Sequence, residues 1–308
     1  MLHKTFGKTG IDVSAVGLGT WNIGNQWGDI DPATAFSTIR SAFDSGVTLF
    51  DTAENYGLPG GTSEERLGTA LPGIRHQVTV VSKTGNWGRR IGRLIPREWP
   101  DTIRLCVHAS LHRLKTDWLD VVLCHEGEIE DPSVYIEGFE ILQKEGRIRS
   151  YGISTNNLAV LKRFNEMGNC SVVQVDYSLL NRKAEAEFLP YCEENNIGVM
   201  VRGPLAKGLL SGRYDKSSVF EDTIRAVWHA DNAAQVKFEA DIDRVEKLKA
   251  VAQPGEEMVQ MALRYVISHP AVSVVIPGAK SPEQAAMNAS AGSEALSDEL
   301  VERLRDLT

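Results

Sequence analysis

Short apolar runs, rich in β-branched residues, alternate with stretches of mixed polarity along most of this chain. Such runs, bounded by polar or turn residues, are typical of buried strands. Eight of them follow one another at fairly regular intervals, at 14–18, 48–51, 78–82, 118–124, 150–154, 172–177, 198–202 and 272–276. Because helical patterns lie between them, the order predicts parallel strands joined by helices.

The stretches between the runs carry helix signals. Asp31-Pro32 and Asp131-Pro132 each place a capping side chain before a proline, which is favoured at the first helical position. Another helix is expected to begin at Ser63, and others to span 102–115, 184–195, 233–251, 256–268 and 298–306. Repeated alternation of strand and helix favours a closed (β/α)8 TIM barrel of the α/β class over an open sheet.

A different pattern precedes the first run. Residues 5–13 are predicted to form a β-hairpin with Lys8-Thr9-Gly10 as its turn, placed before the barrel so that it covers one end. No linker rich in Pro, Gly or Ser and no low-complexity run interrupts the 308 residues. Residues 1–308 are therefore predicted to be a single barrel domain.

Composition narrows the class further. With 42% hydrophobic and 24% charged residues, the chain is globular and long enough for a large core. A net charge of -8 argues against a nucleic-acid partner, and no run approaches the roughly 18 apolar residues of a membrane span. The start of the chain lacks the apolar segment of a signal peptide. Widely spaced cysteines point to reduced thiols and a cytoplasmic location, and they stand at Cys106, Cys124, Cys170 and Cys192.

Reactive side chains stand at the ends of three successive predicted strands. Asp51 ends the second strand, with Tyr56 in the loop that follows. Lys83 follows the third strand and His125 the fourth. Because sites in parallel barrels lie at the carboxyl ends of the strands, these side chains are expected to share one cleft. The alternative is a structural Asp51–Lys83 pair, with the two rings as packing residues.

In the shared cleft these groups suit carbonyl reduction. A phenol has an unperturbed pKa of about 10, so Tyr56 needs a neighbouring cation to act as an acid. Lys83 is expected to lower the pKa of Tyr56 by stabilising the phenolate, and Asp51 to orient the lysine. His125 is placed to hydrogen-bond the carbonyl oxygen of a substrate.

Asp51, Tyr56, Lys83 and His125, in this order and context, resemble the catalytic tetrad of the aldo-keto reductase family. The similarity extends from about Lys4 to Asn288. It implies a (β/α)8 barrel and an NAD(P)H-dependent oxidoreductase that reduces aldehydes or ketones, or oxidises the alcohols, with Tyr56 as general acid. The implied cofactor is NADPH, with NAD as the alternative, and the implied partner is a small-molecule carbonyl substrate.

The resemblance also implies a cofactor site that includes Asp51. Ser154 and Gln174 match residues that hold the nicotinamide carboxamide, whereas Thr155 stands where Asn is usual. Arg202 takes the place of a tyrosine that commonly stacks on the nicotinamide. Residues matching the lining of the nicotinamide pocket are Gly19, Thr20 and Trp21. The pyrophosphate is expected along Gly203, Pro204, Leu205 and Gly208. The adenosine end is expected at Ile276, Gly278, Lys280, Gln284 and Asn288, where Lys280 would pair with a 2′-phosphate.

Two further features are expected near the mouth of the barrel. Aromatic residues are candidates for its rim or for packing, namely Trp21, Trp27, Trp87, Phe220 and Trp228. The segment 86–99 carries Arg89, Arg90, Arg93 and Arg97, and positive charge at the mouth of an acidic protein would attract an anionic substrate or the cofactor phosphates. A solvated arginine surface is the alternative.

Other classes of function have less support. A nucleotide-binding regulatory subunit of the same fold with little turnover remains an alternative to an enzyme. A barrel metal hydrolase would need a ligand cluster, but His108 and His112 have no third ligand nearby in sequence, so no metal site is expected. Gly17-Leu18-Gly19 lacks the third glycine of a Rossmann fingerprint.

Overall fold

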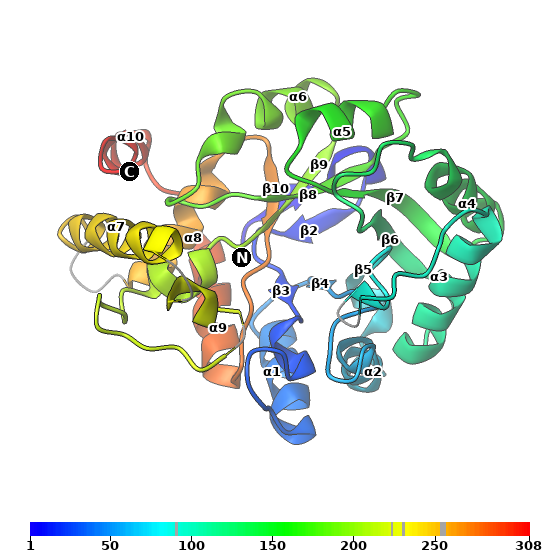
Figure 1. The fold of residues 1–308 in the computed structure, drawn as a ribbon, viewed down its shortest axis with the longest axis horizontal. Helices are drawn as coiled ribbons and strands as arrows, with labels where there is room; N and C mark the ends of the chain where they lie inside the picture. Colours follow the sequence, from blue (N-terminus) through cyan, green and yellow to red (C-terminus); the bar gives the residue numbers. More distant parts are fainter. Residues whose placement is uncertain (90–91, 223, 230–231, 253–256) are drawn as a thin grey trace.

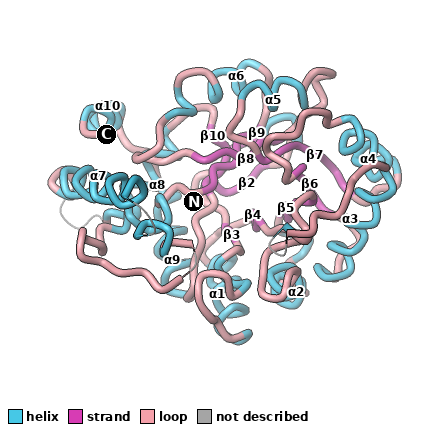
Figure 2. The backbone as a smooth tube through the Cα atoms, viewed as in Figure 1, coloured by secondary structure: helices cyan, strands magenta, loops and turns pink. Residues whose placement is uncertain are grey.

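The computed structural model describes residues 1–308 except 90–91, 223, 230–231 and 253–256. Within the described chain, a parallel sheet occupies the centre and helices surround it (Figures 1 and 2). The strands follow the chain in order around the sheet, as β3 (Leu18–Gly19), β4 (Leu49–Asp51), β5 (Thr79–Thr84), β6 (Leu119–Cys124), β7 (Ile148–Ser154), β8 (Val172–Asp176), β9 (Gly198–Arg202) and β10 (Val272–Val275).

Backbone contacts join the first strand of this sheet to the last. Val16 bridges to Val275 and Gly19 to Gly278, both in parallel orientation. The amide of Gly17 also donates to the carbonyl of Val275 at 2.7 Å. The sheet therefore closes on itself, and the predicted (β/α)8 barrel is confirmed.

The predicted N-terminal hairpin is also confirmed, as β1 (His3–Thr5) paired antiparallel with β2 (Asp12–Ser14). Phe6 and Val13 are fully buried among apolar side chains from the barrel strands, so the hairpin closes one end of the barrel. Lys4 Nζ fastens it by donating to the carbonyls of Ile267 at 2.6 Å and Val272 at 2.9 Å. Burial lowers the pKa of Lys4 to about 8.

Helices cover the outside of the sheet. Their bounds are α1 (Pro32–Asp44), α2 (Thr62–Ala70), α3 (Pro100–Leu114), α4 (Ser133–Lys144), α5 (Leu158–Phe164), α6 (Phe188–Glu194), α7 (Asn232–Lys249), α8 (Met258–Ser268), α9 (Pro282–Ser290) and α10 (Asp298–Asp306). The predicted cap of α1 is present, because Asp31 Oδ1 accepts a hydrogen bond from the Thr34 amide at 3.0 Å. Among the described residues, no helix is long and apolar enough to cross a membrane.

The first predicted barrel strand, 14–18, is divided in the structure. Ser14 ends the hairpin, and the barrel strand proper is Leu18–Gly19. The Ser14 amide donates to Thr48 Oγ1 at 2.8 Å, and the Thr48 amide donates to Ser14 Oγ at 2.9 Å. These two side chains take the backbone bonds that a regular strand ladder would have used.

Two predicted helices are shorter than their patterns. In place of one helix over 184–195, the chain forms a 3₁₀ turn at Lys183–Glu185 and then α6. Pro190 explains the late start, because it has no amide hydrogen and is tolerated only in the first turn of a helix. The helix expected over 256–268 begins at Met258, and Glu256 lies outside the described residues.

We expect Gly152→Ala to destabilise the barrel by about 3 kcal/mol, at the upper end of the cost of overpacking a core. A Cβ at Gly152 would lie 1.7 Å from the carbonyl oxygen of Val172 in the neighbouring strand. Urea denaturation followed by circular dichroism measures the change. Gly60→Ala is the matched control, because its Cβ would meet the Trp87 ring at an ordinary 3.6 Å. Equal stability of the two variants would contradict the prediction.

Candidate active site

Three of the predicted catalytic side chains meet at the carboxyl end of the barrel. Lys83 Nζ lies 2.7 Å from Asp51 Oδ1 and 2.8 Å from Asp51 Oδ2. It also donates to the carbonyl of Thr52 at 2.7 Å, and it lies 3.3 Å from the Tyr56 hydroxyl. Lys83 and Asp51 are both buried. Among the described residues, the ammonium has Asp51 as its ionic partner and the Tyr56 phenol within reach.

The partners of Lys83 keep it charged. Burial by itself would lower the pKa of the ammonium, but Asp51 and Tyr56 outweigh it and the pKa is raised. Burial raises the pKa of the Asp51 carboxyl, and the opposing effects of Lys83 and Gln174 do not cancel that increase. Gln174 Nε2 donates to Asp51 Oδ1 at 3.0 Å, so this carboxylate accepts hydrogen bonds from both side chains.

The pKa of Tyr56 differs from the sequence-based expectation. Burial raises it, and the opposing effects of Lys83 and Arg202 do not cancel that increase. Tyr56 therefore holds its proton at neutral pH, which is the state that a proton donor needs. Lys83 remains beside the oxygen, where it stabilises the phenolate once the proton has left.

His125 completes the group from the loop after β6. Its ring lies 5.9 Å from the Tyr56 ring, centroid to centroid, and nearly perpendicular to it. Burial, Lys83, Arg202 and Arg89 lower the pKa of the imidazole well below its usual value, so it is neutral at neutral pH. His125 Nδ1 has no hydrogen-bond partner among the described residues.

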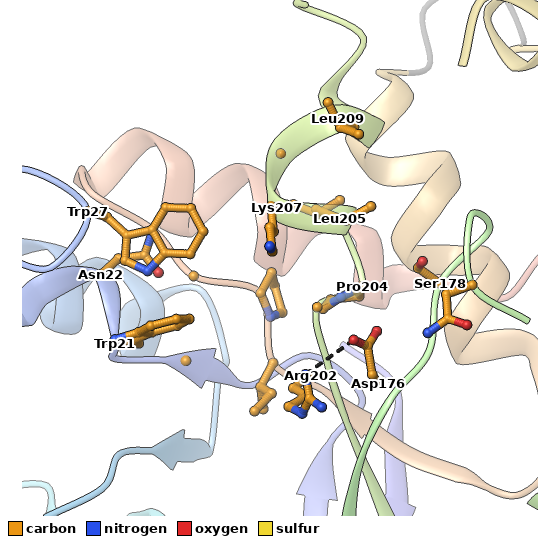
Figure 3. Close-up of a pocket in the computed structure, with 18 of the residues that line it drawn as sticks. Trp21, Asn22, Trp27, Asp176, Ser178, Arg202, Pro204, Leu205, Lys207 and Leu209 are labelled. Carbon is orange, nitrogen blue, oxygen red and sulfur yellow. Dashed lines mark hydrogen bonds and ion pairs between the residues drawn. The ribbon is translucent and has the colours of Figure 1, made fainter. Parts of the chain in front are cut away.

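These side chains adjoin a cleft of about 1250 Å³ at the carboxyl ends of the strands. Figure 3 shows Trp21, Asn22 and Trp27 on one side of it and Pro204, Leu205 and Lys207 facing them. Tyr56 and His125 line it together with most of the expected cofactor residues, which are Gly19, Trp21, Asp51, Ser154, Thr155, Gln174, Arg202, Gly203, Pro204, Leu205, Gly208, Ile276, Gly278, Lys280, Gln284 and Asn288.

Thr20 is the expected cofactor residue that does not line the cleft. It is fully buried, and its hydroxyl donates to the carbonyl of Asp51 at 2.8 Å. A second bond links its hydroxyl to Ser63 Oγ at 2.7 Å. Thr20 is therefore placed to fix the end of β4 rather than to touch a ligand.

The residues expected around a nicotinamide are linked to one another. Ser154 Oγ lies 3.4 Å from Gln174 Oε1. Arg202 is held at the end of β9 by Asp176 Oδ2 and by Asn156 Oδ1, each at 3.2 Å, and Figure 3 marks the ion pair with Asp176. The hydroxyl of Thr155 is already used, because it donates to the carbonyl of Gly127 at 2.6 Å.

The other end of the cleft carries Lys280. Its ammonium donates to the carbonyl of Trp27, and its amide donates to Gln284 Oε1 at 2.9 Å. Burial and then the nearby Arg225 lower the pKa of Lys280. Asn288 Nδ2 steadies the same loop by donating to the carbonyl of Gly278 at 3.2 Å.

Glu54 is a residue of the site region to which the sequence assigned no role. Its buried carboxylate accepts hydrogen bonds from Thr84 Oγ1 at 2.9 Å and from the Gly85 amide at 2.7 Å. The Trp87 amide and Arg97 Nη2 donate to it as well, each at 3.1 Å. Glu54 thus ties the loop that carries Tyr56 to the segment after Lys83. The only signal in the sequence was an acid between Asp51 and Tyr56.

The arginines of 86–99 fall into different environments. Arg89 lines the cleft. Arg93 is exposed and is not part of the cleft lining, whereas Arg90 lies outside the described residues. Arg97 does not supply the free positive charge that was expected at the mouth of the barrel. Its side chain is only 4% exposed and is paired with Glu54.

The expected aromatic rim is present in part. Trp21, Trp27 and Trp228 line the cleft. Trp87 instead packs against Arg113, with 5.2 Å between its ring centroid and the guanidinium carbon. Phe220 is buried in the core beside Trp228.

Among the described residues, no group of three or more His, Cys, Asp or Glu side chains is placed to hold a metal ion.

Comparison with known proteins identifies the family of this arrangement. A model of the Aldo/keto reductase family matches residues 15–308. The chain is similar to the NADH-specific methylglyoxal reductase of Escherichia coli (strain K12), with 32% identity over 326 residues that cover 98% of this chain and 96% of the relative.

Solved structures of similar fold cover nearly the whole chain. The holo form of the aldo-keto reductase AKR11C1 from Bacillus halodurans has a TM-score of 0.83 and 29% identity, covering 100% of this chain and 96% of that one. An aldo-keto reductase from Klebsiella pneumoniae in complex with NADPH has a TM-score of 0.74 and 30% identity, covering 100% and 95%.

We expect Glu54→Ala to lower the free energy of unfolding by about 3–5 kcal/mol, the usual cost of removing one partner from a buried ion pair. The variant leaves the buried Arg97 and two backbone amides without their acceptor. Chemical denaturation measures the loss. Arg149→Ala is the control, because Arg149 is 60% exposed and its partner Asp120 keeps the pairing with Arg75. A loss below about 1 kcal/mol for Glu54→Ala, as expected of exposed pairs, would contradict this role.

Proposed function

The chain belongs to the aldo/keto reductase family of NAD(P)H-dependent oxidoreductases, and on that basis we propose that it reduces a small aldehyde or ketone with NADPH. Residues 1–308 would act as one reductase domain. The observation that carries this proposal is the charged Lys83, held between Asp51 and the hydroxyl of Tyr56 beside an open cleft.

The cleft offers the groups that a nicotinamide dinucleotide needs. Amide and hydroxyl groups of Gln174 and Ser154 lie beside Asp51 and suit a carboxamide. Beyond them, the backbone from Gly203 to Gly208 lines the cleft and suits a pyrophosphate. Among the described residues, Asn55 Oδ1 and the Trp21 and Trp27 Nε1 atoms are buried without hydrogen-bond partners, and all three residues line the cleft.

The proposed mechanism uses four residues in separate roles. The cleft residues around Gln174 and Gly203 would hold NADPH, which would supply a hydride for the carbonyl carbon. Tyr56 gives its proton to the carbonyl oxygen, and Lys83 stabilises the resulting phenolate. The phenolate then takes a proton from water. Neutral His125 orients the carbonyl oxygen by a hydrogen bond. Asp51 holds Lys83 in place and balances its charge.

The preference for NADPH rests on charge at the far end of the cleft. Lys280 and Arg225 both line that end, and Arg225 is paired with Asp222 at 2.7 Å. Lys280, which has no ion pair among the described residues, suits a 2′-phosphate, which NADH lacks. The Klebsiella pneumoniae relative was solved with NADPH, whereas the Escherichia coli relative is NADH-specific, so NAD is the alternative cofactor.

A regulatory subunit with little turnover would use the same cofactor site. Burying an ammonium beside a phenol is costly, and that arrangement has a direct use in proton transfer but none in nucleotide binding alone. Steady-state oxidation of NADPH with simple aldehydes separates the two functions. The absence of turnover, together with tight NADPH binding, would favour the regulatory subunit.

We expect Tyr56→Phe to lower kcat by about 10²–10⁴-fold, the usual range for general acid catalysis. The affinity for NADPH should change little, because the phenol acts on the substrate oxygen in the transition state. Single-turnover reduction and NADPH titration measure the two quantities. Tyr191→Phe serves as the control, since its hydroxyl bonds Asn165 outside the cleft lining. Retention of more than about a tenth of wild-type kcat would reject Tyr56 as the acid.

We expect Lys280→Ala to weaken NADPH binding by about 1.5–3 kcal/mol, the value of a hydrogen bond to a charged group. The affinity for NADH should stay nearly constant, because NADH has no 2′-phosphate. Tryptophan fluorescence titration with each cofactor measures both. Lys249→Ala is a charge-matched control, since Lys249 pairs with Glu246 and does not line the cleft. An equal loss for both cofactors would show that Lys280 only supports the loop.

A further inference from the structure

We propose that Arg89 forms an anion-binding end of the substrate pocket, so that the preferred substrate is a small aldehyde or ketone carrying a carboxylate or phosphate. This inference rests on the proposed carbonyl reduction and names the substrate class. Its basis is geometric, because Arg89 lines the same cleft as Tyr56 and His125.

Arg89 is attached to the catalytic group through one buried residue. Its amide donates to the carbonyl of Asn86 at 3.1 Å, and its Nη1 lies 3.4 Å from Asn86 Oδ1. Asn86 is 7% exposed, and its Nδ2 donates to the carbonyl of His125 at 2.8 Å. The arginine is therefore held near the histidine rather than carried on an unattached loop.

Glu54 fixes the segment that carries Arg89 on both sides of it. The amides of Gly85 and Trp87 bind this carboxylate before Arg89, and the guanidinium of Arg97 binds it afterwards. Between these points the Arg93 amide donates to the carbonyl of Gly88 at 3.0 Å. A cation anchored in this way loses less entropy when it binds an anion.

Arg89 is one of several cations of the cleft without a described ion pair, the others being Lys183, Lys207, Arg213 and Lys280, whereas most acids of the cleft are paired. Asp51 is paired with Lys83, Asp176 with Arg202, and Asp241 with Lys237 and Arg244. No carboxylate of the described residues lies within ion-pair distance of Arg89, and its one described side-chain contact is the amide of Asn86. Its guanidinium is thus open to a ligand.

One acid shares the cleft with Arg89 without forming a described ion pair. Glu128 accepts a hydrogen bond from Asn157 Nδ2 at 2.9 Å. The charge of Arg89 nevertheless reaches the carbonyl-binding end, because it contributes to the lowered pKa of His125. An anionic substrate group would therefore meet a net attraction on the side of Arg89.

The chemistry of the side chain defines the ligand. A guanidinium presents a planar fork of donors that matches the paired oxygens of a carboxylate or phosphate. With the carbonyl oxygen at Tyr56 and His125, an acid group elsewhere on the same molecule would be bound by Arg89. Trp21 lines the same cleft, and its buried Nε1 has no hydrogen-bond partner among the described residues.

The test compares matched acidic and neutral aldehydes with NADPH. One pair is 4-carboxybenzaldehyde and its methyl ester, and the other is glyceraldehyde 3-phosphate and glyceraldehyde. For each pair the measured quantity is the ratio of kcat/KM for the acid to that for the neutral compound. We expect this ratio to exceed one in the wild type and to fall about tenfold in Arg89→Ala for at least one pair, as for loss of one charge-assisted contact.

Arg93→Ala is the matched control, because Arg93 is exposed like Arg89 and carries the same charge on the same segment, but it lies outside the cleft lining. We expect the ratio to stay within about twofold of the wild type in this variant, since exposed charges act weakly at a distance. Arg89→Lys keeps the charge but not the fork, so an intermediate ratio is expected. An equal fall in Arg89→Ala and Arg93→Ala would overturn the site and leave only a general surface field. An unchanged ratio in Arg89→Ala would overturn it as well.

A binding measurement separates this inference from the proposed reaction. The unreactive 4-carbamoylbenzoate is titrated into the NADP-loaded protein and followed by tryptophan fluorescence. We expect Arg89→Ala to bind it about tenfold more weakly than the wild type and Arg93→Ala to bind it equally well. If no aldehyde is reduced but this difference is found, the reaction is wrong and the anion site stands. Equal affinity in the wild type and Arg89→Ala would overturn the site.

Discussion

A buried ammonium is the constraint on which the rest of the site depends. Lys83 sits inside the mouth of the barrel, where an unpaired charge would cost several kcal/mol, on the order of the penalty for burying an ion. Asp51 from the neighbouring strand supplies the opposite charge, and the carbonyl of Thr52 supplies another acceptor. The ammonium also lies beside the hydroxyl of Tyr56, at 3.3 Å. The need to satisfy the lysine therefore fixes where the phenol lies.

The register of the barrel makes this pairing possible. Leu49, Phe50 and Asp51 in β4 pair with Thr79, Val80 and Val81 in β5, so Lys83 extends two residues beyond the level of Asp51. Parallel strands place their carboxyl ends on one face, which brings the loops after β4, β5 and β6 together. The hairpin closes the opposite end with Phe6 and Val13. The cleft with the reactive groups therefore lies at the end opposite the hairpin.

A second buried carboxylate connects the proposed catalytic residues to the proposed anion site. Glu54 lies in the loop between Asp51 and Tyr56, and its partners belong to the end of β5 and the segment that follows. The same contacts that steady Tyr56 also hold the segment bearing Arg89 against the cleft. Catalysis and recognition of a charged substrate group would therefore share one support.

The sequence by itself determined the barrel, its hairpin, and the presence of Asp51, Tyr56, Lys83 and His125 at one face. Strand and helix periods and the order of strand ends are local properties, so they can be read along the chain. Only the tertiary structure separated Arg89 from Arg97 and gave Glu54 its role. It also decided that burial raises the pKa of Tyr56. These differences depend on neighbours from distant strands and on exclusion of water, which sequence spacing does not encode.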